Sequence, residues 1–250
     1  MVPFTVSAVA FAAMFGGALA GMYIRLRLPD HHLQDDSRDV VKLAGGLIGT
    51  LAALVLGLLV ASGKGFYDSQ SSELTQMSAD IVLLDHSLKH YGSEAQDARD
   101  ALRMTVEAIL ERTAASRRSV IASLSGVTGA DVLYDKIEAL EPKTEAQRDL
   151  KTHALNMTVE LGRTRWLMYE QSVASVSRPL LVVMIFWLTV TFFIWGALAQ
   201  INRTLIATIC ISALSSAGAI YLILEMYSPY QGLVQVSSAP LRAALAHLGQ

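Results

Sequence analysis

Hydrophobic residues are concentrated in four long stretches of this chain, two before and two after a more polar middle segment. A helix of about 20 apolar residues, rising 1.5 Å per residue, crosses the roughly 30 Å hydrocarbon core of a bilayer. The pattern therefore predicts four transmembrane spans, at residues 4–24, 41–62, 179–199 and 205–226.

The middle segment, residues 66–177, has the pattern of a helical bundle. Its apolar residues recur three and four positions apart, as on one face of a helix, and no alternating strand pattern is present. No proline follows the second span until Pro142, so one helix can continue from that span to Tyr91, and Gly63 and Gly65 are the only local positions where it could break. Its apolar seam would comprise Leu74, Met77, Ile81, Leu84, Leu88 and Tyr91.

Capping and turn signals predict where the other helices of this bundle begin and end. Ser93 to Gln96 and Thr144 to Gln147 match the capping box, in which Ser or Thr and a Gln three residues later bond free backbone N–H groups. The first box is expected to open a helix that reaches about Leu124. Ser125 to Ala130 is expected to form a turn, and Pro142 to follow the end of a short helix.

Together these patterns predict an all-α membrane protein: four transmembrane helices with a helical extramembrane bundle inserted between spans 2 and 3. The parts would be a transmembrane hairpin at 1–65, the bundle at 66–177, a second hairpin at 178–227 and an amphipathic tail at 228–250. Four spans place both termini and the bundle on one side. Positive residues flank the two faces equally, so the side is left open.

Small residues recur at every fourth position of the second span. A ridge of this kind lets helix backbones approach closely in lipid, so we expect this helix to have a close neighbour. The ridge consists of Gly45, Gly49, Ala53, Gly57, Ala61 and Gly65.

The same helix carries the candidate pore-lining residues. Small side chains and hydroxyls suit the wall of a pore, and a lysine at its end would attract anions. The alternatives are that the ridge only packs within the chain, that Thr50 bonds its own backbone, and that Lys64 extends to the lipid headgroups. The candidates are Gly49, Thr50, Ala53, Gly57, Ala61 and Lys64.

Glu225, at the end of the fourth span, is the candidate ion or switch site. Ionisable residues are rare in membrane spans and are often functional. Its carboxylate could act as an ion site or pair with Arg178 or Lys64; the alternative is a boundary residue in contact with water.

Composition narrows the function classes. Of the residues, 52% are hydrophobic and 17% charged, and the net charge of -2 comes without a basic stripe, so no nucleic-acid partner is expected. The single cysteine, Cys210, excludes a disulfide framework within the chain. Because no nucleophile-base constellation or phosphate-binding glycine loop is present, we expect neither an enzyme nor a cofactor.

Two histidine pairs are candidate metal ligands. His31 and His32 lie in the loop between the first two spans. His86 and His90 lie four apart beside Asp85, and His153 is a candidate for the opposite side of that site. Neither spacing supplies a recognisable ligand set, and hydrated surface explains both pairs, so no metal site is expected.

Three segments resemble the bestrophin-like family of largely bacterial four-span membrane proteins. They are GTLAALVLGLLVASGKGFYD in the second span, the Leu224-Glu225 pair, and GLVQVSSAPLRAAL in the tail. Tyr227 departs from that family's pattern, which often has an acidic residue there. The resemblance implies a multi-pass protein of the bacterial inner (plasma) membrane and a relation to bestrophins, pentameric anion channels whose second span lines the pore.

The expected function is therefore an oligomeric ion channel, conducting anions, with inorganic ions and further copies of the chain as partners. A membrane-anchored signalling or scaffolding protein, whose helical bundle recruits a partner, is the alternative. The long helix predicted to leave the bilayer suits such a bundle, whether the bundle transmits motion or recruits a partner.

Overall fold

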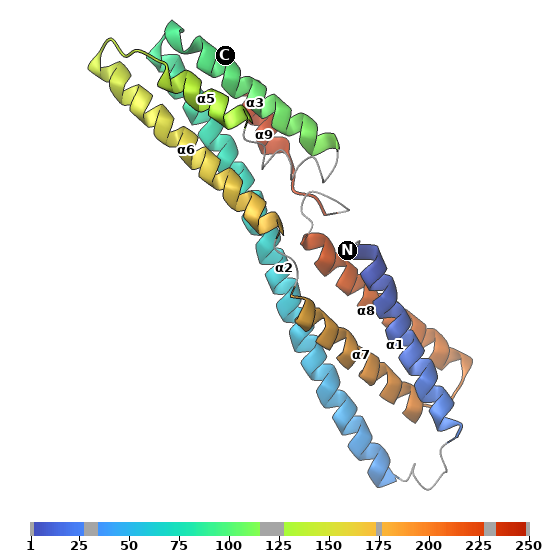
Figure 1. The fold of residues 1–250 in the computed structure, drawn as a ribbon. Coiled ribbons are helices and arrows are strands. Elements are labelled where there is room, and N and C mark those ends of the chain that lie inside the picture. Colours follow the sequence, from blue (N-terminus) through green and yellow to red (C-terminus); the bar gives the residue numbers. More distant parts are fainter. Residues whose placement is uncertain (1–2, 28–34, 116–127, 174–176, 228–233, 249–250) are drawn as a thin grey trace. The chain divides into compact units, whose positions relative to one another are not determined.

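The computed structural model describes residues 3–27, 35–115, 128–173, 177–227 and 234–248 (Figure 1). Within these ranges the regular structure is entirely helical, as predicted, and four helices are long and apolar enough to cross a membrane. The chain divides into two compact units. One comprises Met1–Phe66 and Ser175–Tyr227, and the other Tyr67–Ala174 and Ser228–Gln250.

The first unit contains the four candidate spans. They are α1 (Pro3–Arg25), the first part of α2 (Asp35–Tyr91), α7 (Arg178–Leu198) and α8 (Arg203–Met226). The predicted span positions agree with these helices, and α2 continues without a break through Gly63 and Gly65. The core of this unit includes Met14, Ala18, Met184, Phe192, Ile209, Ala213 and Ile220.

Helices α1 and α7 pack with their backbones in contact. A Cβ atom at Gly21 would meet the carbonyl oxygen of Phe193, and one at Gly196 would meet that of Ala18. At Gly17 a Cβ would lie 3.0 Å from two atoms of Thr189. The helix contact expected from the small pair Gly17 and Gly21 is therefore present, and its partner is α7.

Polar side chains form hydrogen bonds with free backbone groups at the end of α7 and at the start of α8. The Leu198 carbonyl oxygen accepts hydrogen bonds from Arg25 Nη1 at 2.8 Å and from Arg38 Nη2 at 3.0 Å. The positive guanidinium groups also suit the negative end of the α7 dipole. At the start of α8, Asn202 Oδ1 accepts from the Leu205 backbone N–H at 2.7 Å, which is a standard N-cap.

The second unit is a helical bundle with its own core. It contains the last part of α2, a short 3₁₀ turn η2 (Ser93–Ala95), α3 (Gln96–Ala115), α5 (Thr128–Glu138), α6 (Glu145–Val173) and α9 (Ala239–His247). All six residues of the predicted α2 seam are buried here. The tail helix α9 adds Leu241, Ala244 and Leu248 to this core.

The two predicted capping boxes have different outcomes. At α6 the Gln147 backbone N–H donates to Thr144 Oγ1 at 3.2 Å, so this cap forms. Gln147 Oε1 accepts from the Lys143 N–H at 2.8 Å. The box at Ser93 is wrong: Gly92, with φ of 125°, precedes the 3₁₀ turn, and Gln96 Nε2 donates to Asp100 instead. A positive φ favours glycine and ends α2 without a side-chain cap.

The predicted turn is also wrong in part. Residues 128–130 form the first turn of α5, while residues 116–127, including the expected end of the preceding helix at Leu124, lie outside the described residues. The reason for the error is that Ser, Gly and Thr are frequent both in turns and in first helical turns, where their side chains and backbone freedom are compatible with capping.

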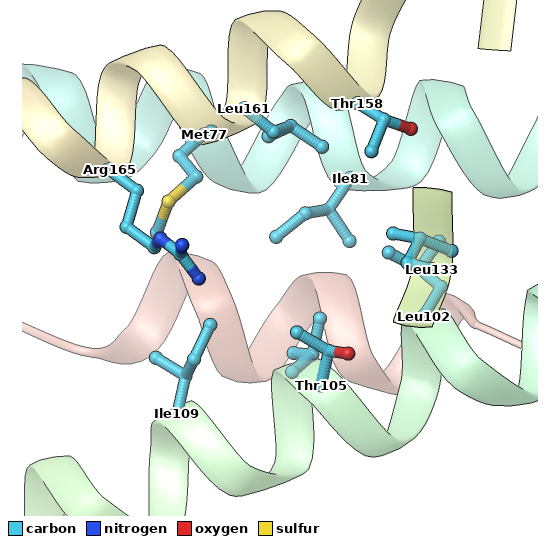
Figure 2. A pocket seen from close by; sticks show the side chains of 11 residues that line it. Met77, Ile81, Leu102, Thr105, Ile109, Leu133, Thr158, Leu161 and Arg165 are labelled. Atoms are coloured by element: carbon cyan, nitrogen blue, oxygen red, sulfur yellow. The ribbon is translucent and has the colours of Figure 1, made fainter. Parts of the chain in front are cut away.

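The bundle core contains a small, partly open cavity of about 50 Å³ between α2, α3, α5 and α6. Figure 2 shows Met77, Ile81 and Leu161 around it, with the Arg165 side chain reaching toward its edge. A cavity known to admit benzene is about 150 Å³. The cavity between these helices is therefore smaller than the space that a benzene-sized ligand occupies.

Candidate pore-lining surface

One side of α2 packs against the rest of the first unit. Gly45, Ala52 and Leu59 are buried, and they are spaced seven residues apart, which is close to two helical turns. A Cβ at Gly45 would contact Ile194 of α7 at 3.1 Å. Near its other end, Gly63 is buried against Tyr227. The face of α2 that meets its own chain is thus only one side of the helix.

The predicted ridge is divided by this packing. Gly45 is buried and Gly49 half-buried beside Thr191, whereas Ala53, Gly57 and Ala61 are exposed. Apart from the nearby backbone of α2 itself, no heavy atom of the described residues lies within 4 Å of a Cβ built at Gly57 or Gly65. Packing within the chain therefore accounts for the first part of the ridge and leaves the second part uncovered by the described residues.

The exposed ridge residues belong to a continuous strip of small or polar side chains. Thr50, Ala53, Gly57, Ala61 and Lys64 follow one another three or four positions apart and are all exposed in the single chain. We refer to them as the small-residue strip. Thr50 Oγ1 donates to the Gly46 carbonyl at 2.9 Å, as one alternative anticipated, and its oxygen retains capacity to accept a hydrogen bond.

A second exposed strip lies beside the first and is chemically different. It consists of Leu47, Leu51, Leu54 and Leu58, also three or four positions apart. Leu54 is 67% exposed and Leu58 60% exposed. Long aliphatic side chains of this kind suit contact with acyl chains, whereas the small-residue strip presents little apolar volume. We refer to these four residues as the leucine strip.

An open groove of about 460 Å³ borders the small-residue strip. Thr50 and Ala53 line it from α2, Thr191 and Trp195 from α7, and Ser216 from α8. Thr191 Oγ1 donates to Trp187 O at 2.9 Å and Ser216 Oγ to Ser212 O at 3.0 Å. Thr191, Ser212 and Ser216 were not among the site residues predicted from the sequence. Their hydroxyl groups within otherwise apolar spans are the feature that could have indicated them.

Glu225 is buried within the first unit. Only 4% of it is exposed, at the end of α8. It shares a hydrogen bond with the Tyr221 side chain, one helical turn earlier. Sequence reasoning considered Arg178 and Lys64 as partners and overlooked Tyr221, although the four-residue spacing places both side chains on one helix face.

The residue after α8 contacts α2 through its aromatic ring. Tyr227 Oη lies 2.8 Å from Ser62 Oγ, and the Tyr227 ring stacks on Phe66 with 5.3 Å between ring centroids. Gly63 allows this approach, because a Cβ there would lie 3.3 Å from the ring. The bestrophin-like pattern often has an acidic residue at position 227. In this chain the residue there, Tyr227, packs against α2 instead.

Of the two histidine pairs in the sequence, the structure describes only one. His31 and His32 lie outside the described residues. His86 and His90 are exposed on α2, while Asp85 is occupied by Arg99 through hydrogen bonds of 2.7 and 2.9 Å. His153 lies exposed on α6. Among the described residues there is no group of three or more His, Cys, Asp or Glu side chains that could hold a metal ion.

Four membrane-length apolar helices, with no strand among the described residues, indicate a multi-pass helical membrane protein. A comparison with protein families matches residues 12–241 to the family described as Bestrophin-like domain. Because the match extends over most of the chain, this protein belongs to the Bestrophin-like domain family, as the sequence resemblance predicted. Comparisons with curated proteins and with solved structures gave no match.

Proposed function

We propose that this chain forms a homo-oligomeric ion channel in which the small-residue strip of α2 faces the conduction path. Membership of the Bestrophin-like domain family supports a membrane-embedded oligomer of the bestrophin-like channel kind. A pentamer in the bacterial inner membrane is the assembly that the resemblance favours. The proposed activity is passive ion flow, not catalysis.

The exposure of the small-residue strip is the observation that carries this proposal. Ala53, Gly57 and Ala61 are uncovered in one copy, although Gly45, Ala52 and Leu59 of the same helix are buried. The leucine strip beside them has the bulk that lipid contact or packing requires. A surface of Gly, Ala and Thr leaves space for water and ions along an assembly axis, and its hydroxyl can contact them.

Charge supports anions as the conducted species. Residues 43–63 contain no Asp or Glu, and Lys64 follows at the end of the small-residue strip. A ring of Lys64 side chains, one from each copy, would raise the local positive potential and concentrate anions at that end of the path.

Flux through liposomes tests the activity. The purified chain would be reconstituted, and chloride, sodium and potassium fluxes measured under imposed gradients. The proposal expects chloride flux that exceeds both cation fluxes. A well-formed oligomer without any flux would contradict it and favour the alternative of a signalling or scaffolding protein.

Cysteine accessibility tests which strip faces the path. Cys210 is the only cysteine, so a Cys210→Ser background accepts single reporters. In that background, Gly57→Cys and Ala61→Cys should react with a charged, water-soluble thiol reagent and lose flux. Leu54→Cys and Leu58→Cys are the matched controls on the leucine strip and should remain unmodified. The reverse pattern would assign the path to the leucine strip.

A further inference from the structure

His86 and His90 form a close pair on the surface of the second unit. They lie four residues apart on α2, both side chains are exposed, and their Nε2 atoms share a hydrogen bond of 3.0 Å. The rings are nearly perpendicular, at 78°, with 4.5 Å between centroids. The sequence favours hydrated surface for these residues, because it gives their spacing but not the distance between the two ring nitrogens.

The separation of the two nitrogens matches what one metal ion requires. With metal–nitrogen bonds of roughly 2.1 Å, two nitrogens 3.0 Å apart subtend an angle of about 90° at the ion. That angle is the one between neighbouring ligands in square-planar and octahedral coordination. Metal binding would replace the hydrogen bond between the rings: the Nε2 that donates in it would lose its proton, with Nδ1 protonated instead, so that both Nε2 lone pairs are available to the ion.

We propose that His86 and His90 form a two-nitrogen chelating site for a divalent transition-metal ion, with Cu²⁺ the preferred ion. Imidazole suits copper, nickel and zinc, a tetragonal angle suits Cu²⁺ and Ni²⁺, and Cu²⁺ has the highest affinity in the divalent series. The proposal does not depend on ion conduction by the protein.

The surroundings define how complete this site is. Asp85 is directed to Arg99 and accepts two hydrogen bonds from it, so it is not a third ligand. Because the described residues bring together no larger group of ligand side chains, water completes the coordination of the bound ion. Such a site is open and exchanges its ion readily, unlike a closed four-ligand structural site.

Calorimetric titration of the tag-free, full-length protein with Cu²⁺ tests the site. The His86→Ala/His90→Ala variant should bind Cu²⁺ at least about tenfold more weakly, because the second nitrogen of a placed pair binds as an intramolecular ligand. Both side chains are exposed, so the fold should be unchanged, which circular dichroism checks. Unaltered Cu²⁺ affinity in this variant would overturn the proposal.

The second histidine pair supplies the matched control. His31→Ala/His32→Ala removes the same number of imidazoles and should leave the tight Cu²⁺ site intact. Electron paramagnetic resonance of bound Cu²⁺ should show coupling to two imidazole nitrogens in this control and lose it in His86→Ala/His90→Ala. Loss of the signal in the control, with retention in the other variant, would place the copper at the wrong pair and refute the inference.

Discussion

Gly196 on α7 lies so close to the carbonyl oxygen of Ala18 on α1 that a methyl group at position 196 would overlap it. The neighbouring atoms belong to the backbone of α1, so they cannot rotate away as a flexible side chain could. Gly21 has the same relationship to the Phe193 carbonyl in the opposite direction. Each helix therefore has a glycine that packs directly against a backbone carbonyl of the other helix.

Gly196→Ala should destabilise the first unit by about 1–3 kcal/mol, because the added methyl overpacks a backbone contact. Gly16→Ala on α1 is the control, since a Cβ there would meet no described residue of another helix within 4 Å. Alanine is the better helix former, so this control should be neutral or slightly stabilising. Thermal unfolding in detergent would compare them, and equal midpoints would contradict the close packing.

Arg25 and Arg38 should act cooperatively, since both donate to the Leu198 carbonyl. Replacing either with Met leaves one hydrogen bond and should cost roughly 1 kcal/mol. Replacing both leaves the carbonyl without these donors and should cost more than the sum of the single changes. A double-mutant cycle measured by thermal unfolding checks this; strictly additive effects would show that the two arginines act independently.

Breaking the ion pair between Arg99 and Asp85 should strongly destabilise the second unit. The side chains are only 12% and 8% exposed, and hydrogen bonding to Asp85 raises the pKa of Arg99. Asp85→Asn should therefore cost about 3 kcal/mol, because it leaves a poorly hydrated guanidinium without its counter-charge. Arg103→Met breaks an exposed pair with Glu107 and should change stability by less than about 1 kcal/mol. Denaturant unfolding compares the two variants.

The pair of Glu94 and Lys143 should make stability depend on acid pH. Lys143 Nζ donates to Glu94 Oε1 at 2.9 Å, and this bond lowers the pKa of Glu94 from its ordinary value. In the unfolded chain Glu94 binds its proton at higher pH, so the contribution is complete above the ordinary pKa and is lost as pH falls through the lowered one. Lys143→Met should remove this part of the acid dependence. Because both groups are exposed, high salt should weaken the effect.

Gly57→Leu should reduce ion flux or disrupt assembly, because a large side chain would fill the centre of the small-residue strip. Leu58→Met is the control on the leucine strip; it conserves volume and should retain flux. Liposome flux measured together with the size of the solubilised complex separates a blocked path from a failed assembly. Full flux from an intact Gly57→Leu oligomer would exclude the strip from the path.

The helices of this protein could be predicted well because their signals are local. Apolar periodicity located the spans and the buried seam from Leu74 to Tyr91, and Thr144 correctly marked the start of α6. The sequence did not predict that the first part of the α2 ridge is buried and the second part exposed. This difference depends on which residues of α7 contact Gly45 and Gly49. The burial of Glu225 also depends on helices distant in sequence, whereas its partner Tyr221 could have been found from the four-residue spacing.

The uncovered glycine and alanine surface of α2 has a consequence for how a single copy would be solvated. Acyl chains are flexible rods that make their best dispersion contacts with bulky, ridged surfaces, and a flat strip around Gly57 offers them few partner atoms. An isolated subunit would leave its neighbouring lipids imperfectly packed along this line. A helix of a second copy, packed against this line, would restore these contacts.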